Sequence, residues 1–264
     1  KYMDMYYHEP KNFEDFVYIG LVMQGNGMEE SVEAMRRGRP YCMGALYWQI
    51  NDDWPVVSWS SIDYYDNWKA QHYRMRDVLA PLALGVEYKD DKLRYYTMSD
   101  YLKDHDNLRL TVQVVDFTTG KRKEFKEWVK ANANDSRVVK TFHVADLVTE
   151  EEKAHTMIRA FLTDRRGNVI STKDHFFYWP NKLDLPKTEV KTRIKYKDGE
   201  YQVTLSSKNL AKDLFLEIPI QGARFSDNFI DLLPGEKRTI VITSPQLKAA
   251  DRTPITLKHV RETY

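Results

Sequence analysis

A short segment with the sequence YWQINDDWPVVSWSSIDYY, residues 47–65, combines three tryptophans, three tyrosines and three aspartates. Aromatic faces stack on the C–H groups of sugars, and carboxylates handle hydroxyls and protons, so these side chains could form a carbohydrate-processing site. The same composition is also typical of a buried loop whose rings pack together. Residue types alone therefore leave three alternatives open: an aromatic core, a sugar platform or a catalytic site.

A helix is predicted before this segment, over residues 13–37. Asn12 can cap its first turn, and Asp15 lies at the third helical position. Gly25 and Gly27 weaken its middle, because glycine is a poor helix former. We expect the helix to bury an apolar stripe made of Phe13, Phe16, Val17 and Leu21.

An almost continuously apolar run without charge, YCMGALYWQ at 41–49, predicts a strand that is buried on both faces. A second helix, at about 67–80, is predicted to end at Pro81. The order helix, buried strand, long loop, helix is typical of a fragment of a parallel α/β fold. Active sites of α/β barrels gather at the C-terminal ends of the strands, so the functional edge would hold Trp48, Gln49, Asn51, Asp52, Asp53 and Trp54.

From about residue 83 the hydrophobic pattern changes to a period of two, which is typical of strands with one buried face. The clearest case is 108–114, and similar segments lie near 84–99, 137–144, 156–163 and 169–178. Turn signals at 118–120 and 165–168 separate them, and Thr149 with Glu152 forms a capping-box pair. This spacing predicts an antiparallel sandwich.

A second sandwich is predicted after WPNKLDLPK, residues 179–187, whose two prolines indicate a boundary. Alternating residues on both sides of the Lys197-Asp198-Gly199 turn predict a hairpin. Further strands are expected at 214–220, around 240–242 and from 255, with the turn LLPGE at 232–236. The length of this tail suits a small immunoglobulin-like domain.

Composition excludes several classes of protein. Forty basic and 39 acidic residues leave a formal charge of +1, so neither a nucleic acid nor a membrane is an expected partner. Cys42 is the only cysteine, which rules out an internal disulfide and a cysteine zinc site. No run of apolar residues approaches the length of a membrane span.

The chain does not begin with methionine, and we expect it to be part of a longer protein. The compartment stays open, with a secreted, periplasmic or lysosomal location preferred to a cytoplasmic one.

The run RPYCMGALYWQINDDWPVVSWSSIDYYDNWKAQHY, residues 39–73, closely resembles the end of the catalytic barrel in the β-mannosidases of glycoside hydrolase family 2. FSDNFIDLLPGEKRTIVI at 225–242 resembles their C-terminal immunoglobulin-like domain, and NFEDFVYIGLVMQ at 12–24 resembles the helix before the last barrel strand. This sequence departs from the family in two places. Many relatives have cysteine where this chain has Asp53, and relatives often carry an acidic residue in the stretch that reads QGNGM here, residues 24–28.

The resemblance implies a mixed fold: the end of a (β/α)8 TIM barrel (helix, strand, helix) in residues 1–82, followed by two antiparallel immunoglobulin-like β-sandwich domains at 83–183 and 184–264. It also implies a retaining exo-β-mannosidase that releases terminal, non-reducing β-D-mannose with two carboxylates about 5 Å apart. In the family both catalytic glutamates lie on earlier barrel strands, so we expect this chain to hold neither. Asp52, Asp53, Asp63 and Glu9 therefore receive no catalytic role.

The resemblance assigns substrate binding to three residues. Trp48 matches a tryptophan that forms the wall or floor of the terminal sugar pocket, and Asn51 and Asp52 follow it, either bonding sugar hydroxyls or supporting the wall. Residues 54–65 more plausibly join the barrel to the next domain. His72 is interpreted as a satisfied structural histidine. No cofactor and no metal are expected; the expected partners are a β-mannoside oligosaccharide and the remainder of the parent chain.

Two alternatives remain. The sandwiches could be non-catalytic carbohydrate-binding or scaffold modules, with candidate aromatics Tyr95, Tyr96, Trp128, Tyr178 and Trp179. The parent could instead have another family 2 specificity, β-galactosidase or β-glucuronidase. The WQINDDWP run, residues 48–55, argues against this because those relatives usually have a different loop after the last strand.

Overall fold

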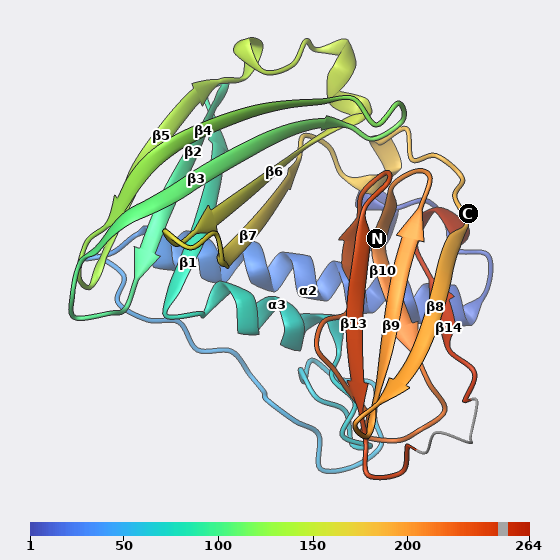
Figure 1. Ribbon diagram of the computed structural model, residues 1–264. Coiled ribbons are helices and arrows are strands. Elements are labelled where there is room, and N and C mark those ends of the chain that lie inside the picture. The colour runs from blue at the N-terminus through green and yellow to red at the C-terminus, as the bar shows by residue number, and fades with distance from the viewer. Residues whose placement is uncertain (248–252) are drawn as a thin grey trace.

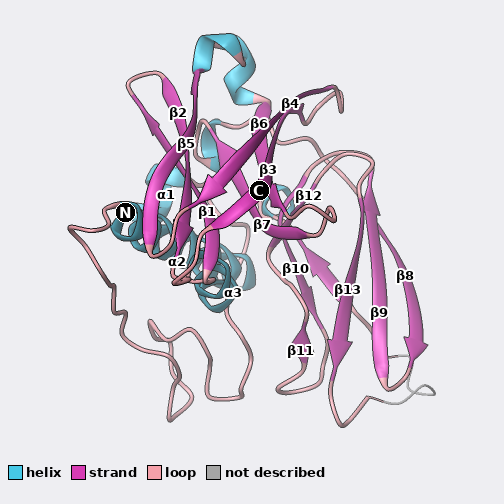
Figure 2. Ribbon diagram, turned by 60° about the vertical axis from the view of Figure 1, so that its left-hand side comes forward, coloured by secondary structure: helices cyan, strands magenta, loops and turns pink. Residues whose placement is uncertain are grey.

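The computed structural model describes residues 1–247 and 253–264. A helical layer at the N-terminal end packs below a curved β-sandwich, and a second sandwich stands beside both (Figure 1). The view turned by 60° shows α2 and α3 below the first sandwich, with β8, β9 and β13 of the second sandwich to the right of these helices (Figure 2). The helices thus lie where both sandwiches meet.

The helical layer contains α1 (Tyr2–Tyr6), α2 (Phe13–Arg37) and α3 (Ala70–Val78). The predicted bounds of α2 are confirmed, and the side chain of Asn12 accepts a hydrogen bond of 2.8 Å from the backbone N–H of Asp15. Acidic residues in its first turn and two arginines in its last turn complement the helix dipole. The α3 helix is shorter than the predicted 67–80, because the chain before Ala70 remains tied to the preceding loop.

The predicted buried stripe of α2 is wrong. Phe13, Phe16 and Val17 are exposed to solvent, whereas the face made of Tyr18, Ile19 and Val22 is buried against α3 and the second sandwich. Both faces carry apolar residues at helical spacing, so periodicity could not say which one the rest of this chain covers.

The predicted buried strand at 41–49 is also wrong for this chain. The segment is extended but pairs with no strand among the described residues, and Tyr41 and Leu46 are fully exposed. A parallel strand is stable only between neighbouring strands that satisfy its backbone groups. Residues 1–82 do not supply such neighbours.

The first sandwich confirms the predicted antiparallel pattern. One sheet has the order β1 (Leu82–Lys89), β2 (Lys92–Ser99), β5 (Asp135–His143). The facing sheet has the order β4 (Arg122–Ala131), β3 (His105–Asp116), β6 (Thr156–Thr163), β7 (Val169–Phe176). The core lies between them and contains the inward residues of 108–114 that the alternation indicated. Only β4 was missed, because its charged sequence belongs to a largely exposed edge strand.

The second sandwich likewise contains two small antiparallel sheets. One has the order β11 (Arg224–Phe225), β13 (Lys237–Thr243), β9 (Glu200–Ser207), β8 (Val190–Lys197), and the other β12 (Ile230–Leu232), β10 (Ala211–Glu217), β14 (Thr256–Lys258). The predicted hairpin is present, with Gly199 at a φ of 85° in its turn. Glycine takes this left-handed conformation without steric cost.

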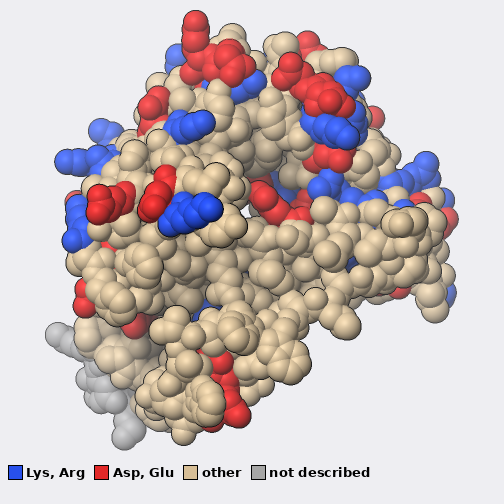
Figure 3. Space-filling view, turned by 180° about the vertical axis from the view of Figure 1, so that it is seen from behind, with Lys and Arg blue, Asp and Glu red and all other residues tan. Residues whose placement is uncertain are grey.

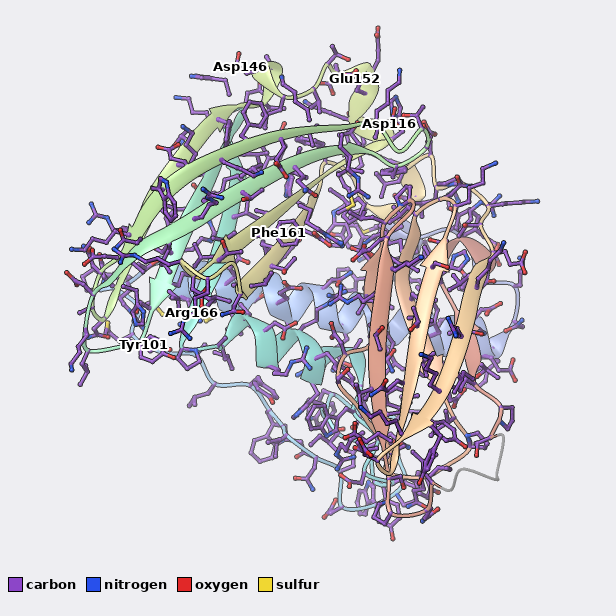
Figure 4. All side chains as sticks on the ribbon, in the orientation of Figure 1. Tyr101, Asp116, Asp146, Glu152, Phe161 and Arg166 are labelled. Carbon is purple, nitrogen blue, oxygen red and sulfur yellow. The ribbon has the colours of Figure 1, made fainter. Side chains whose placement is uncertain are left out.

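Short 3-10 helices lie between strands at η1 (Val144–Asp146), η2 (Glu151–Ala154) and η3 (Pro180–Lys182), and η4 (Val260–Glu262) follows β14. The predicted capping pair is present before η2, where the Thr149 N–H donates to Glu152 Oε2 at 2.8 Å and the Glu152 N–H donates to Thr149 Oγ1 at 3.3 Å. Asp146 and Glu152 lie at one end of the first sandwich, and Arg166 lies in a turn at the opposite end (Figure 4).

A separate core joins the helices to both sandwiches. Tyr18 of α2 stacks near Phe215 and Phe229, and its hydroxyl donates to the backbone oxygen of Asp213 at 2.6 Å. Tyr73 of α3 contacts the same Phe229 ring. The helical layer is therefore held firmly even though one face of α2 is open to solvent.

Candidate functional site: the loop after Trp48

The loop after Trp48 closes on itself through backbone hydrogen bonds. The Ile62 N–H donates to the Ile50 oxygen at 2.8 Å, and the Asp52 N–H donates to the Ile62 oxygen at 3.1 Å, which makes a short parallel bridge between Asn51 and Ile62. The Lys69 N–H then donates to the Ser61 oxygen at 2.9 Å, just before α3 begins. The loop is irregular, but its backbone is fixed at several points.

Ser61 is the centre of this closure. Its fully buried hydroxyl donates to the Ile50 oxygen at 2.9 Å, and it also lies 3.2 Å from the Tyr47 hydroxyl and 3.0 Å from His72 Nδ1. A serine hydroxyl has one proton to donate. Because Ser61 donates that proton to the Ile50 oxygen, the Tyr47 hydroxyl and His72 Nδ1 act as donors to the Ser61 oxygen. These contacts bracket Trp48 on both sides along the chain.

Asp52 is a second anchor. Its side chain is 2% exposed and accepts hydrogen bonds of 2.6 Å from Ser58 and Ser60, while Lys69 Nζ lies 3.4 Å from Oδ2. Burial alone would raise the pKa of the Asp52 carboxyl, but the two hydroxyls and the Lys69 ammonium outweigh it and hold the pKa below its ordinary value. A carboxylate that is buried, ionised and fully partnered supports the loop and is not poised to donate a proton.

The other residues expected to bind substrate are at the surface. The Trp48 side chain is 74% exposed, and the peptide bond between Trp48 and Gln49 is cis. Asn51 is exposed, and its amide reaches only the Asp52 backbone oxygen, at 3.3 Å. Trp48, Asn51 and Asp52 thus lie on one loop, but the side chains of Trp48 and Asn51 face solvent, whereas that of Asp52 is buried within the loop.

Two residues of this loop were missed by sequence reasoning. Lys69 and Ser61 have no distinctive motif around them. Only the folded loop brings Lys69 to Asp52 and Ser61 to Ile50.

His72 agrees with its interpretation as a structural histidine, because it contacts Ser61 and its ring lies 4.2 Å from the Trp68 ring, centroid to centroid. Burial lowers the pKa of its imidazole, helped by the nearby arginines 224 and 76.

The aromatics proposed as a sugar platform on the sandwiches do not form one. Tyr95 is buried, Trp179 packs 4.4 Å from the Tyr6 ring, and the Tyr178 hydroxyl donates to Glu150. Trp128 is exposed on β4, but Arg109 covers one of its faces at 4.7 Å. Arg37 lies over the ring of Tyr96 at 5.5 Å, so each candidate ring is either buried or already in contact with a neighbouring side chain.

A cavity of about 680 Å³ lies where α2, α3, β7 and the second sandwich meet. Charged side chains of both signs line it. Seen from behind, charged side chains of both signs surround a central hollow, and fewer of them lie on the lower part of this face (Figure 3). Lys173 pairs with Glu29 and Glu33 at 2.6 Å each, and Arg159 donates to both oxygens of Asp174. Arg159 also pairs with Glu236 of the second sandwich at 3.0 Å, so these ion pairs connect the helices and both sandwiches.

Within residues 1–247 and 253–264, no cluster of histidine, cysteine or acidic side chains has a metal-binding arrangement. No helix in this part of the chain is long and apolar enough to cross a membrane.

Comparisons with known proteins agree on one family. Residues 91–181 match the model of a mannosidase Ig/CBM-like domain, and residues 185–263 match an Ig-fold domain of mannosidases. β-Mannosidase B of Thermothelomyces thermophilus is 28% identical over 89% of this chain, and the β-mannosidase of Capra hircus is 30% identical over 87%. This chain is a homologue of the β-mannosidases. The expected resemblance is thereby confirmed.

This chain spans about 30% of the length of the Thermothelomyces relative and 27% of the length of the goat enzyme. Its fold is similar to that of the β-D-mannosidase of Dictyoglomus thermophilum, with a TM-score of 0.84 over 98% of this chain, 31% of that chain and 24% identity. The exo-β-D-glucosaminidase CsxA has a TM-score of 0.69 over 97% of this chain, 34% of that chain and 16% identity. Both likenesses concern the fold.

Proposed function

We propose that this chain is the part of a retaining exo-β-mannosidase that supplies the last strand of a (β/α)8 barrel, in residues 1–82, and two accessory sandwiches at 83–183 and 184–264. The parent enzyme would release terminal β-D-mannose from β-mannoside oligosaccharides, and its two catalytic glutamates would lie elsewhere in the parent chain. The observation that carries this proposal is the exposed Trp48 side chain on a loop whose backbone is anchored at Ser61 and Asp52.

The exposed apolar surface around Trp48 supports a barrel partner. The extended segment 41–50 exposes Tyr41, Leu46 and Ile50, and α2 exposes Phe13 and Phe16. Exposed apolar side chains gathered on one segment are typical of a contact with other protein. In a closed barrel the same segment would pair with neighbouring strands and α2 would cover it from outside, which accounts for the apolar residues on both faces of the helix.

Two of the described carboxylates near Trp48, those of Asp52 and Asp63, are already engaged within the loop. Asp52 is held by Ser58, Ser60 and Lys69, and Asp63 accepts from the N–H and the amide of Asn67. A retaining glycosidase needs two carboxyl groups about 5 Å apart that both reach the glycosidic bond. In this proposal Trp48 lines the sugar pocket, Asn51 faces it, and Asp52 supports the wall.

The test is hydrolysis of a panel of aryl glycosides by the full-length parent and by this chain alone. We expect the parent to cleave the aryl β-mannoside in preference to the β-galactoside, the β-glucuronide and the β-glucosaminide, and this chain to cleave none of them. Preference for another glycoside would contradict the proposed specificity. Robust cleavage by the isolated chain would contradict the proposed division of labour.

A further inference from the structure

The Ser61 hydroxyl contacts the residues on both sides of Trp48 along the chain. It donates to the backbone oxygen of Ile50 at 2.9 Å and lies 3.2 Å from the hydroxyl of Tyr47. The Ser61 N–H adds contacts of 3.1 and 3.2 Å to the oxygens of Gln49 and Ile50. One buried residue therefore fixes both ends of the short segment that carries the exposed indole.

Both anchors of this segment lead to the same helix. Ser61 lies 3.0 Å from Nδ1 of His72, in the first turn of α3, and the Asp52 cluster contains Lys69, the residue that precedes the helix. Lys69 Nζ also lies 2.7 Å from Ser60 Oγ, so the ammonium connects Asp52 to the serine pair. The α3 helix is itself packed against α2 and the second sandwich. The segment is thus tied to the rigid part of the molecule.

The exposed indole of Trp48 has little packing of its own that could set its direction. Its placement must come from the backbone, because an exposed loop without such ties samples many conformations. A binding wall is effective only when supporting contacts hold it close to the productive geometry.

We infer that Ser61 and Asp52 are positioning residues that hold Trp48 in the substrate-binding orientation, with Ser61 acting through Tyr47 and Ile50 and Asp52 through Ser58, Ser60 and Lys69. This inference rests on the proposed function of Trp48. It adds that the sugar-facing loop is preorganised by α3 and that neither positioning residue touches the substrate.

The first experiment measures the local stability of the loop in the absence of substrate. Amide hydrogen exchange is followed over residues 47–52 in the wild-type chain and in the variants Ser61→Ala and Tyr47→Phe, which remove one hydroxyl each. Ser207→Ala is the matched control, because Ser207 is also buried and its hydroxyl donates to a backbone oxygen, that of Asn209, in the second sandwich. We expect exchange at 47–52 to become at least about tenfold faster in the two loop variants and to be unchanged in the control. Unchanged exchange in Ser61→Ala would overturn the inference.

The second experiment asks whether the loop contacts act through Trp48. In the full-length parent, Ser61→Ala should lower kcat/KM for an aryl β-mannoside by about tenfold or more, because a displaced wall misorients the sugar. When Trp48 is already alanine, adding Ser61→Ala should have almost no further effect, since residues that act as one unit are not additive. Fully additive losses would show a general structural role and would overturn the inference.

The two experiments separate this inference from the proposed function. Faster exchange at 47–52, together with a parent that does not act on β-mannosides, would confirm the anchoring of the loop and overturn the assigned substrate. Unchanged exchange with an active parent would leave the proposed function in place and overturn the role of Ser61.

Discussion

Arg74 of α3 donates from Nη2 to Oδ1 of Asp213 at 2.7 Å and links the helical layer to the second sandwich. The same guanidinium lies 3.5 Å from Glu29 of α2 and donates to the backbone oxygen of Phe229 at 3.0 Å. Asp213 is fully buried, and Lys212 approaches its other oxygen at 3.1 Å. One arginine thus connects two helices and a strand that lie far apart in sequence.

Replacing Arg74 with methionine should destabilise the chain by about 3 kcal/mol, because it removes one of the two cationic partners of the buried Asp213 carboxylate and leaves Lys212 alone to compensate it. The measurement is the urea midpoint of unfolding. Lys130→Met is the control, since Lys130 forms its ion pairs with Asp104 and Asp106 at the exposed surface. The urea midpoint of Arg74→Met should be clearly lower than that of Lys130→Met, and equal midpoints would contradict the role assigned to Arg74.

Replacing either of two glycines of α2 by alanine should change the stability of the chain in opposite directions. A methyl group at Gly25 would lie 3.1 to 3.2 Å from Ala70 and Gln71 of α3, whereas one at Gly27 would meet nothing within 4 Å. Gly27→Ala should therefore stabilise the helix by about 0.5 to 1 kcal/mol, because alanine loses less backbone entropy on folding. Gly25→Ala should destabilise the chain through forced separation of α2 and α3. Thermal unfolding of both variants checks this, and stabilisation by both would show that the helices can move apart freely.

The stability of the chain should fall between pH 6.5 and 4, in part because of His175. Burial and the neighbouring Lys173 ammonium lower the pKa of His175 to about 4, and the rings of Tyr88 and Phe177 pack against it. In this window the unfolded chain binds a proton that the folded chain does not, so stability rises with pH and is lost as pH falls. The full effect amounts to about 3 kcal/mol.

The variant His175→Phe isolates this contribution. Its free energy of unfolding should depend less steeply on pH between 6.5 and 4 than that of the wild type, whatever its absolute stability. Asp116, whose pKa its hydrogen bonds lower to about 2 despite burial, loses its contribution at more acidic pH. Identical slopes for the two proteins would contradict the neutral, buried state of His175.

The sequence predicted most reliably the features that local contacts determine. Asn12 capped the helix that begins at Phe13, and the Lys197-Asp198-Gly199 turn joined two strands of a hairpin, because each depends on residues near in the chain. The strand predicted at 41–49 failed for the opposite reason. Its apolar sequence is suited to a buried parallel strand, but burial requires neighbouring strands, and residues 1–82 supply none.

The site was predictable only in part. The sequence indicated that Trp48 lies at the end of an apolar run and that Asp52 either bonds sugar or supports the wall, and the buried Asp52 cluster agrees with support. The sequence could not indicate Ser61 or Lys69, since their roles arise from loop closure and the start of α3. It also could not choose between the two apolar faces of α2.

The most direct test of the central claim is the effect of Trp48→Ala on the full-length parent, measured as kcat/KM for an aryl β-mannoside. Trp59→Ala is the matched control, because Trp59 is similarly exposed and we assign residues 54–65 to the connection with the sandwich. We predict a loss of at least about tenfold for Trp48→Ala with unfolding unchanged, as the removal of one sugar-facing ring implies, and a much smaller loss for Trp59→Ala. An unchanged rate in Trp48→Ala would contradict the claim that this loop faces the sugar.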